Sequence, residues 1–248
     1  MSPARPAGPS RLATYFHVHL VSDSTGETLN AMAKGRAGSL RGLNVTAPFK
    51  EQALAAADEV SETARLCGSA NLLVVEGGRI RADSTDGAGL LAALAEQAPG
   101  LALSGQPVLI LGAGGAARAA AAALKAAGAD VGVLNRTPER AKALAADLGV
   151  RVAGPGALAE AALVVNALSV PPEVDVRALT AGSVLMDMTY RPLLTPFLAA
   201  GRARGLATVD GLAMLIGQAR PSFEALFGVA PPPVDVRALA LAALGEAS

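Results

Sequence analysis

The sequence predicts an α/β protein, with a doubly wound parallel sheet beside a second, smaller and truncated α/β lobe. Four short apolar runs alternate with helical stretches, which is typical of parallel strands covered by helices on both faces. The runs are residues 108–111, 131–134, 163–165 and 184–186. A glycine turn follows the first run, where such sheets bind ligands. We assign the large sheet to residues 101–210 and the smaller lobe to residues 14–100 together with 211–248.

Local patterns predict the elements of the smaller lobe. The first residues are rich in proline and alanine, which predicts a disordered tail, and the aromatic and β-branched run after them predicts a strand. Gly77 and Gly78 mark a turn, and Pro99 ends a helix. The expected elements are a tail at 1–13, strands at 15–21, 43–45 and 72–75, helices at 27–37, 51–64 and 90–98, and a helical segment at 211–248.

Two helices are expected between the strands of the large sheet. The first follows the glycine turn, spans residues 116–127 and stops at Gly128, since glycine commonly ends helices. The second runs through Lys142 to Asp147. Strand and helix therefore alternate at the pitch of a doubly wound fold.

Composition excludes several classes of function. The 248 residues carry 21 basic and 21 acidic side chains, so the chain has no basic surface for nucleic acid or an anionic membrane. The longest weakly charged stretch, 89–117, is interrupted by Pro99 and Gly100 and cannot span a membrane. With one cysteine and two histidines, disulfides, metal sites and Ser-His-Asp catalysis are not expected. The first 15 residues show no apolar core typical of a signal peptide, and we expect a cytoplasmic protein.

The glycine turn predicts a dinucleotide site of the Rossmann type. A first glycine permits the tight turn, a second lets the backbone approach a pyrophosphate, and the helix N-terminus that follows favours phosphate. Chance is the alternative in a chain with 27 glycines. The residues expected to contact the cofactor here are Gly112, Ala113, Gly114, Gly115 and Ala116.

The end of the next strand favours NADP(H) over NAD(H). An acidic residue normally holds the free ribose 2′-hydroxyl there, but this chain has Asn135, Arg136 and Thr137, with Arg140 one turn later. Two guanidinium groups and a hydroxyl suit a 2′-phosphate. The alternative is that both arginines only decorate a solvated helix start.

The segment Asn44–Lys50 is the second chemical motif. Asn44 and Thr46 offer polar groups at a strand end, and Lys50 opens a helix, where the dipole favours the neutral amine needed for proton exchange. Asp86 could hold the ammonium in place. A surface lysine and a helix-capping aspartate are the alternative.

These motifs resemble those of the shikimate dehydrogenase family. The matching segments are residues 44–50, 84–89, 112–118, 135–137, 187–192, 195–196 and 211–218. The resemblance implies NADPH-dependent, reversible reduction of 3-dehydroshikimate to shikimate, a step of aromatic amino acid biosynthesis. A quinate/shikimate-type dehydrogenase and a non-catalytic NADP-binding remnant of the family are the alternatives. A monomer or homodimer is expected, with a small molecule as the only partner.

The resemblance also implies roles for single residues. Lys50 and Asp86 would be the catalytic pair. The substrate would be held by Thr46, Asn71, Tyr190 and Gln218, and the cofactor also by Met188 and Gly211. Each has a structural alternative: a packed core tyrosine for Tyr190, a strand-end cap for Asn71 and a solvated helix residue for Gln218.

The N-terminal part departs from the family pattern. Residues 16–34 resemble the opening of the phosphoenolpyruvate synthase regulatory protein family, which predicts a junction that lacks the family's own first segment. The turn in this stretch contains Ser22 and Ser24, which we expect to replace a Ser-x-Ser pair that binds the substrate carboxylate. Elsewhere, Ser84 replaces the family's asparagine and Leu168 its threonine near the nicotinamide.

Overall fold

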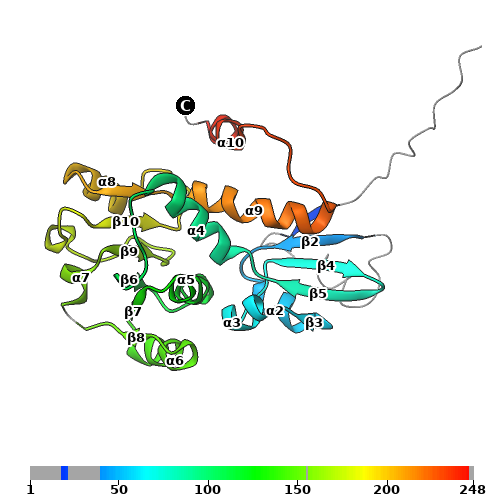
Figure 1. The fold of residues 1–248 in the computed structure, drawn as a ribbon, viewed down its shortest axis with the longest axis horizontal. Helices are drawn as coiled ribbons and strands as arrows, with labels where there is room; N and C mark the ends of the chain where they lie inside the picture. The colour runs from blue at the N-terminus through cyan, green and yellow to red at the C-terminus, as the bar shows by residue number, and fades with distance from the viewer. Residues whose placement is uncertain (1–17, 22–39, 155, 246–248) are drawn as a thin grey trace, which may run out of the picture.

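The computed structural model describes residues 18–21, 40–154 and 156–245 of the chain. These residues form two sheets that lie side by side, and two long helices, α4 (Asp86–Gln97) and α9 (Gly211–Phe227), run between them (Figure 1). No helix among the described residues is long and apolar enough to cross a bilayer.

The larger sheet is fully parallel and confirms the predicted fold. Its strand order is β11-β10-β9-β6-β7-β8, which is the doubly wound order of a Rossmann-type domain. The strands are β6 (Pro107–Leu111), β7 (Asp130–Leu134), β8 (Arg151–Val152), β9 (Leu163–Asn166), β10 (Val184–Asp187) and β11 (Ala207–Val209). The helices are α5 (Gly115–Ala126), α6 (Pro138–Leu148), α7 (Ala157–Glu160) and α8 (Pro196–Ala203), with the 3₁₀ turn η1 (Val176–Ala178).

The smaller sheet is mixed, with the order β1-β2-β4-β5-β3. β2 pairs with β1 in parallel and with β4 antiparallel, and β5 pairs antiparallel with β4 and parallel with β3. Its strands are β1 (Val18–Val21), β2 (Gly42–Val45), β3 (Glu59–Val60), β4 (Leu72–Glu76) and β5 (Arg79–Asp83), and its helices are α2 (Lys50–Ala55) and α3 (Glu62–Cys67). The helix α10 (Val236–Leu244) follows α9.

The single helix expected at 51–64 is wrong. The chain leaves α2 at Ala56 and forms β3, and α3 then begins after Ser61, whose hydroxyl accepts a hydrogen bond from Ala64 N at 3.0 Å. A serine in this N-cap position starts a new helix, which breaks the continuous helical pattern. β5, which was not predicted, follows the turn at Gly77 and Gly78, whose φ values of 57° and 79° are those of a tight hairpin.

Glycines let α4 pack closely between its neighbours. A Cβ added at Gly89 would lie 2.6 Å from Met214 O on α9, and one at Gly87 would lie 2.8 Å from the Ala123 Cβ on α5. Only glycine allows backbones to approach this closely. As a result, the first turn of α4 stands where both sheets and α9 meet.

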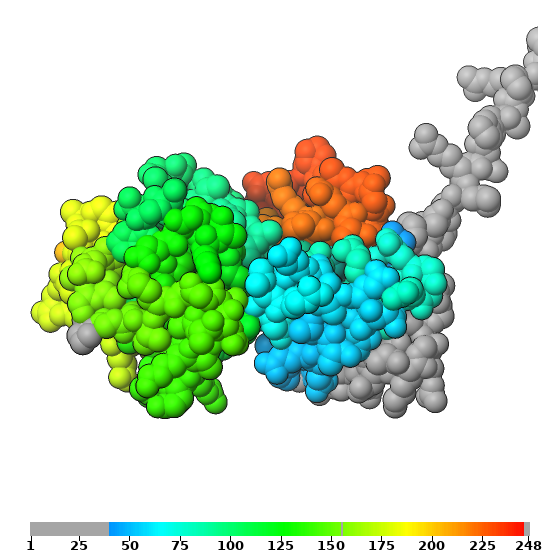
Figure 2. Space-filling model, turned by 60° about the horizontal axis from the view of Figure 1, so that its bottom comes forward, coloured from blue at the N-terminus to red at the C-terminus, as the bar shows by residue number. Residues whose placement is uncertain are grey.

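A hydrogen bond also joins the two halves directly. The Arg118 Nε on α5 donates to Leu66 O in the last turn of α3 at 2.8 Å, and its Nη1 donates to Asp147 Oδ2 on α6 at 2.8 Å. In Figure 2 the smaller sheet and its helices, in cyan, meet the green Rossmann-type half along a seam. Arg118 therefore links the helix behind the glycine turn to the smaller lobe.

Candidate active site

Lys50 and Asp86 form the ion pair that the sequence predicted. Lys50 is the first residue of α2 and Asp86 the first residue of α4, and Lys50 Nζ lies 2.6 Å from Asp86 Oδ2. The Asp86 side chain is 5% exposed and that of Lys50 is 28% exposed. The carboxylate is therefore buried, whereas the lysine side chain is partly accessible to a molecule outside.

Asn71 forms hydrogen bonds with the residues around this pair. Its Nδ2 lies 3.0 Å from Asp86 Oδ1, 2.9 Å from Thr85 Oγ1 and 3.3 Å from Gln218 Oε1. Its Oδ1 accepts a hydrogen bond from Thr85 N at 2.8 Å. The structure thus brings together four predicted residues, Lys50, Asp86, Asn71 and Gln218, which come from four separate elements or loops.

Backbone hydrogen bonds fix these elements to one another. Ala70 N donates to Lys50 O at 2.9 Å, and Val45 N donates to Asn71 O at 2.8 Å. Because the segment before β4 bonds to both α2 and the end of β2, the amide of Asn71 keeps its place beside the ion pair.

Two residues of the network, Thr85 and Ser222, were missed in the sequence. Thr85 Oγ1 lies 3.3 Å from Ser222 Oγ, which donates to Gln218 O at 3.2 Å. Both residues are buried. Thr85 directly precedes Asp86, and Ser222 lies one helical turn after Gln218, so adjacency to a predicted residue was the available signal.

Cys67 and Ser84 are buried next to the ion pair. Burial raises the pKa of the Cys67 thiol, and the nearby Asp86 carboxylate acts in the same direction. The Ser84 hydroxyl faces this thiol and lowers its pKa, against the two other effects, but its Oγ has no well-aligned hydrogen bond to another described residue. The serine therefore keeps a polar group at the position of the family's asparagine without using it in the network.

Two other predicted substrate residues, Thr46 and Tyr190, do not take part in this hydrogen-bond network. Thr46 is exposed in the turn before α2, and Tyr190 is 43% exposed after β10. Neither side chain forms a hydrogen bond with any described residue. Tyr190 is therefore not the packed core residue of the alternative interpretation. Ser22 and Ser24 lie outside the described residues.

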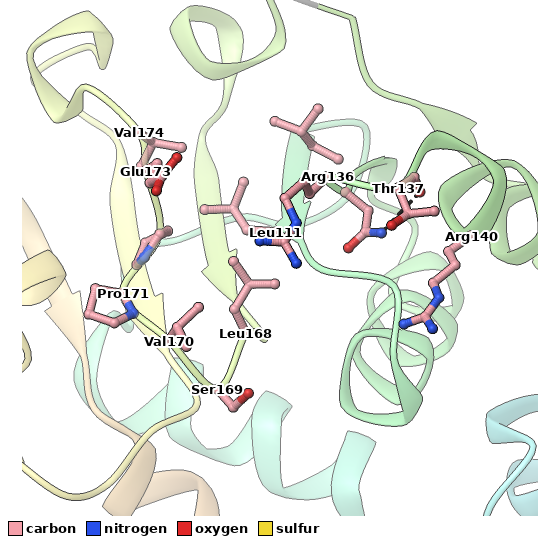
Figure 3. Close-up of a pocket in the computed structure, with 13 residues that line it drawn as sticks. Leu111, Arg136, Thr137, Arg140, Leu168, Ser169, Val170, Pro171, Glu173 and Val174 are labelled. Carbon is pink, nitrogen blue, oxygen red and sulfur yellow. Dashed lines mark hydrogen bonds between the residues drawn. The ribbon is translucent and has the colours of Figure 1, made fainter.

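A pocket of about 670 Å³ lies at the carboxyl ends of the parallel strands, beside the N-terminus of α6. Arg136, Thr137 and Arg140 line it from one side, and the loop 168–174 lines it from the other (Figure 3). Neither arginine pairs with a carboxylate of the described part of the chain, whereas Asn135 Nδ2 donates to Thr137 O at 3.0 Å. Two unpaired guanidinium groups and a hydroxyl fit the 2′-phosphate of NADP(H).

The glycine turn next to this pocket leaves room for a ligand. Gly112 has a φ of 116°, a conformation that favours glycine, and a Cβ there would lie 3.2 Å from the Leu168 side chain. A Cβ on Gly114, the N-cap of α5, would meet no atom within 4 Å. Ala113 and Ala116 flank this open backbone, and Gly115 begins α5, so that its N-terminal amides face free space.

Met188 and Gly211 are close to each other. Met188 is half-buried after β10, and a Cβ added to Gly211 would lie 2.6 Å from Met188 O. Close contact between the start of α9 and this loop explains the glycine. Among the described residues, no cluster of three or more His, Cys, Asp or Glu side chains could hold a metal ion.

Comparison with known proteins identifies the family. A family profile described as "Shikimate dehydrogenase substrate binding domain" matches residues 11–73, and one described as "Shikimate / quinate 5-dehydrogenase" matches residues 93–179. The shikimate dehydrogenase (NADP(+)) of Caulobacter vibrioides is 52% identical over 226 residues, covering 85% of this chain and 79% of the relative. The chain belongs to the shikimate dehydrogenase family. A member from Acidiphilium cryptum is 46% identical, covering 92% of this chain and 85% of that protein.

Solved structures of the family have the same fold. Shikimate 5-dehydrogenase from Thermus thermophilus in complex with shikimate has a TM-score of 0.81 at 40% identity, covering 90% of this chain and 85% of that one. Quinate dehydrogenase from Corynebacterium glutamicum in complex with NAD has a TM-score of 0.78 at 32% identity, with the same coverage. The predicted fold class and family are therefore confirmed.

The family match to residues 11–73 includes residues 16–34. The expected resemblance of that stretch to the phosphoenolpyruvate synthase regulatory protein family is not shown by these comparisons, and it stays a prediction.

Proposed function

We propose that this chain catalyses the reversible, NADP-dependent oxidation of shikimate to 3-dehydroshikimate. The observation that carries the proposal is the Lys50–Asp86 ion pair, held by Asn71 and Gln218 at the junction of the two halves. The names of the relatives, at 46–52% identity, support the same reaction and cofactor.

Bound NADP(H) supplies a nicotinamide ring that accepts or donates the hydride. The protein supplies the proton: in the reducing direction, the Lys50 ammonium donates one to the oxygen of the carbonyl group that becomes a hydroxyl. In the oxidising direction the Lys50 amine receives that proton. Asp86 holds the Lys50 nitrogen in place in both directions, through the contact of 2.6 Å between Nζ and Oδ2.

The remaining site residues are proposed to bind the two ligands. Asn71, Gln218, Thr46 and Tyr190 would hold hydroxyl and carboxylate groups of the substrate. Arg136, Thr137 and Arg140, with Asn135 shaping their turn, would hold the 2′-phosphate. The open backbone at 112–116 would receive the pyrophosphate, and Met188 and Gly211 would lie at the nicotinamide end.

The domain organisation is part of the proposal. Residues 14–100 with 211–248 would form the substrate domain, and residues 101–210 the NADP-binding domain. A monomer or homodimer acting in the cytoplasm remains our expectation.

The N-terminal proposal concerns Ser22 and Ser24. We propose that residues 16–34 derive from the regulatory protein's opening and that the two hydroxyls bind the substrate carboxylate in place of the family's pair. The double variant Ser22→Ala/Ser24→Ala should then raise KM for shikimate without changing NADPH affinity. An unchanged KM would refute this role.

The test of function is oxidation of shikimate by NADP+, followed by nicotinamide absorbance, with NAD+ and quinate in parallel. We expect turnover with shikimate and a preference for NADP+. Faster turnover of quinate would assign the chain to the quinate-type enzymes. NADPH binding, measured by its fluorescence, without turnover of either substrate would identify a non-catalytic NADP-binding remnant.

A further inference from the structure

Asp187 is a buried carboxylate that the proposed mechanism does not use. It ends β10, is 2% exposed and forms no ion pair with a described residue. Three donors reach its oxygens: Asn166 Nδ2 at 3.1 Å, Thr189 N at 3.0 Å and Thr195 Oγ1 at 2.8 Å. Burying a carboxylate costs desolvation free energy, so packing alone does not explain why an aspartate occupies this position.

The first donor connects Asp187 to the loop after β9. Asn166 is 1% exposed and uses both ends of its amide: its Nδ2 donates to Asp187 Oδ1, and its Oδ1 accepts from Leu168 N at 3.2 Å. Leu168 lines the cofactor pocket and lies over Gly112. The carboxylate therefore reaches one wall of that pocket through a single side chain.

The second donor belongs to the loop after β10. Thr189 N shares Asp187 Oδ1 with Asn166, and Thr189 stands between Met188 and Tyr190. β9 and β10 are adjacent parallel strands, so their carboxyl ends meet at the same edge of the sheet. One oxygen atom thus fixes the first turns of two loops that flank the proposed reaction centre.

The third donor closes the loop from its far end. Thr195 Oγ1 donates to Asp187 Oδ2 and also accepts from Leu198 N at 3.3 Å, which caps α8. The chain from Asp187 to Thr195 is therefore tied to the carboxylate at both ends. Contact of Gly211 with the Met188–Thr189 peptide supports the same loop from α9.

We propose that Asp187 is a positioning residue for the reaction. It fixes the loop that holds Leu168 and the loop Met188–Tyr190 relative to each other, so that cofactor-binding and substrate-binding residues face one site. The inference rests on the proposed function for the roles of Met188 and Tyr190. The link from Asp187 through Asn166 to Leu168 does not depend on those roles, because Leu168 lines the pocket itself.

The test compares Asp187→Ala with Asp187→Asn. Asparagine keeps an oxygen for Asn166 and Thr189 and can donate to Thr195 Oγ1, whereas alanine removes all three bonds. We expect Asp187→Ala to raise the Kd for NADPH and KM for shikimate by roughly tenfold or more, because small displacements of positioning groups are costly. Asp187→Asn should stay within about threefold of the parent chain for both.

Ser183→Ala is the matched control for lost stability. Ser183 directly precedes β10, at the end of the strand opposite to Asp187. It is 1% exposed, and its hydroxyl donates to Ala161 O at 2.8 Å. Ser183→Ala should lower Tm and leave both binding constants unchanged. If Asp187→Ala lowers Tm but matches Ser183→Ala in Kd and KM, Asp187 is only structural and the proposal is wrong.

A second pair of variants keeps the test decisive if Asp187→Ala does not fold. Thr195→Val should raise KM for shikimate while Thr195→Ser restores it, and equal KM values for both would overturn the proposal. Measuring the Kd for NADPH does not require turnover. If the parent chain proves inactive, a raised Kd in Asp187→Ala still supports positioning of the Leu168 loop, and an unchanged Kd refutes it.

Discussion

The catalytic cluster and the cofactor pocket differ in how their polar groups are satisfied. At the cluster, Lys50, Asp86, Asn71 and Gln218 bond to one another before any ligand arrives. In the pocket, Arg136 and Arg140 are exposed and have no ionic partner among the described residues. The protein thus builds its proton-handling site internally, but leaves the charge of its cofactor site to be balanced by an anion.

This difference has an energetic basis. Asp86 is buried, and an isolated buried charge costs several kcal/mol, on the order of 3–5 when its partner is removed. The cluster must therefore be neutralised within the protein. Exposed arginines are hydrated, so their lack of a partner costs little, and the full gain from charge-assisted hydrogen bonds remains for the ligand.

The largest expected effect comes from breaking the cluster at Lys50. Lys50→Ala should lower kcat for shikimate oxidation by about 10²–10⁴-fold, which is the usual contribution of a positioned proton-exchange group. The Kd for NADPH should remain unchanged, because Lys50 lies outside the cofactor pocket. Steady-state kinetics and NADPH fluorescence measure the two quantities.

Lys50→Arg separates proton exchange from charge. A guanidinium can keep the ion pair with Asp86 but does not release its proton. We therefore expect Lys50→Arg to be nearly as inactive as Lys50→Ala. Substantial activity in the arginine variant would show that Lys50 acts only through its positive charge.

The second effect concerns the unpaired cations of the pocket. Arg136→Ala and Arg140→Ala should each raise KM for NADP+ by roughly 10–100-fold, since a hydrogen bond to a charged group contributes about 1.5–3 kcal/mol. KM for NAD+ should hardly change, because NAD+ lacks the 2′-phosphate. Lys142→Ala, an exposed cation on the same helix that does not line the pocket, is the control. Equal losses for NADP+ and NAD+ would assign the arginines to general phosphate attraction.

The same two regions show what could be predicted from sequence. The arginine side of the pocket and the glycine turn beside it are local motifs at the ends of two apolar strands, so the sequence indicates both, whereas the loop 168–174 on the other side of the pocket was not predicted. The Lys50–Asp86 pair also followed from two motifs. The Asn71–Gln218 contact joins residues 147 positions apart, and Ser222 enters through the packing of α9 on the smaller lobe. No local pattern encodes such contacts.

The fold shows a similar limit. Strands β6, β7, β9 and β10 were found because they are largely apolar, as strands buried on both faces must be, whereas the short strands β8 and β11 were not predicted. β5 was missed although its five residues alternate polar and apolar, because the run is short and three of its side chains are charged. β3 has two residues and exists only through pairing with β5. Short and half-exposed strands are therefore defined by their partners more than by their own sequence.

The smallest predicted effect tests whether the close geometry of an ion pair alone implies a catalytic role. Arg237 on α10 lies 2.6 Å from Asp210, the same distance as in the Lys50–Asp86 pair, but it ties α10 to the start of α9. Because Gln97 Nε2 and Ala213 N still donate to the Asp210 carboxylate, Arg237→Ala should lower Tm by only about 3–6 °C, from a loss of about 1–2 kcal/mol, with kcat unchanged. A fall in kcat comparable to that of Lys50→Ala would show that the Arg237–Asp210 pair also affects catalysis, and that the two ion pairs do not differ as proposed.

The pH dependence of this loss follows from Asp210. Burial raises the pKa of Asp210, but hydrogen bonds from Arg237, Ala213 N and Gln97 outweigh burial and hold the pKa below its ordinary value. A lowered folded-state pKa stabilises the fold above the unfolded value of about 4, and this contribution disappears as the pH falls through the folded-state pKa. The Tm difference between the parent chain and Arg237→Ala should therefore be constant from about pH 7 to 5 and shrink below about pH 4. A difference that stays constant below pH 4 would mean that Arg237 stabilises α10 through packing of its aliphatic stem and not through the charge of Asp210.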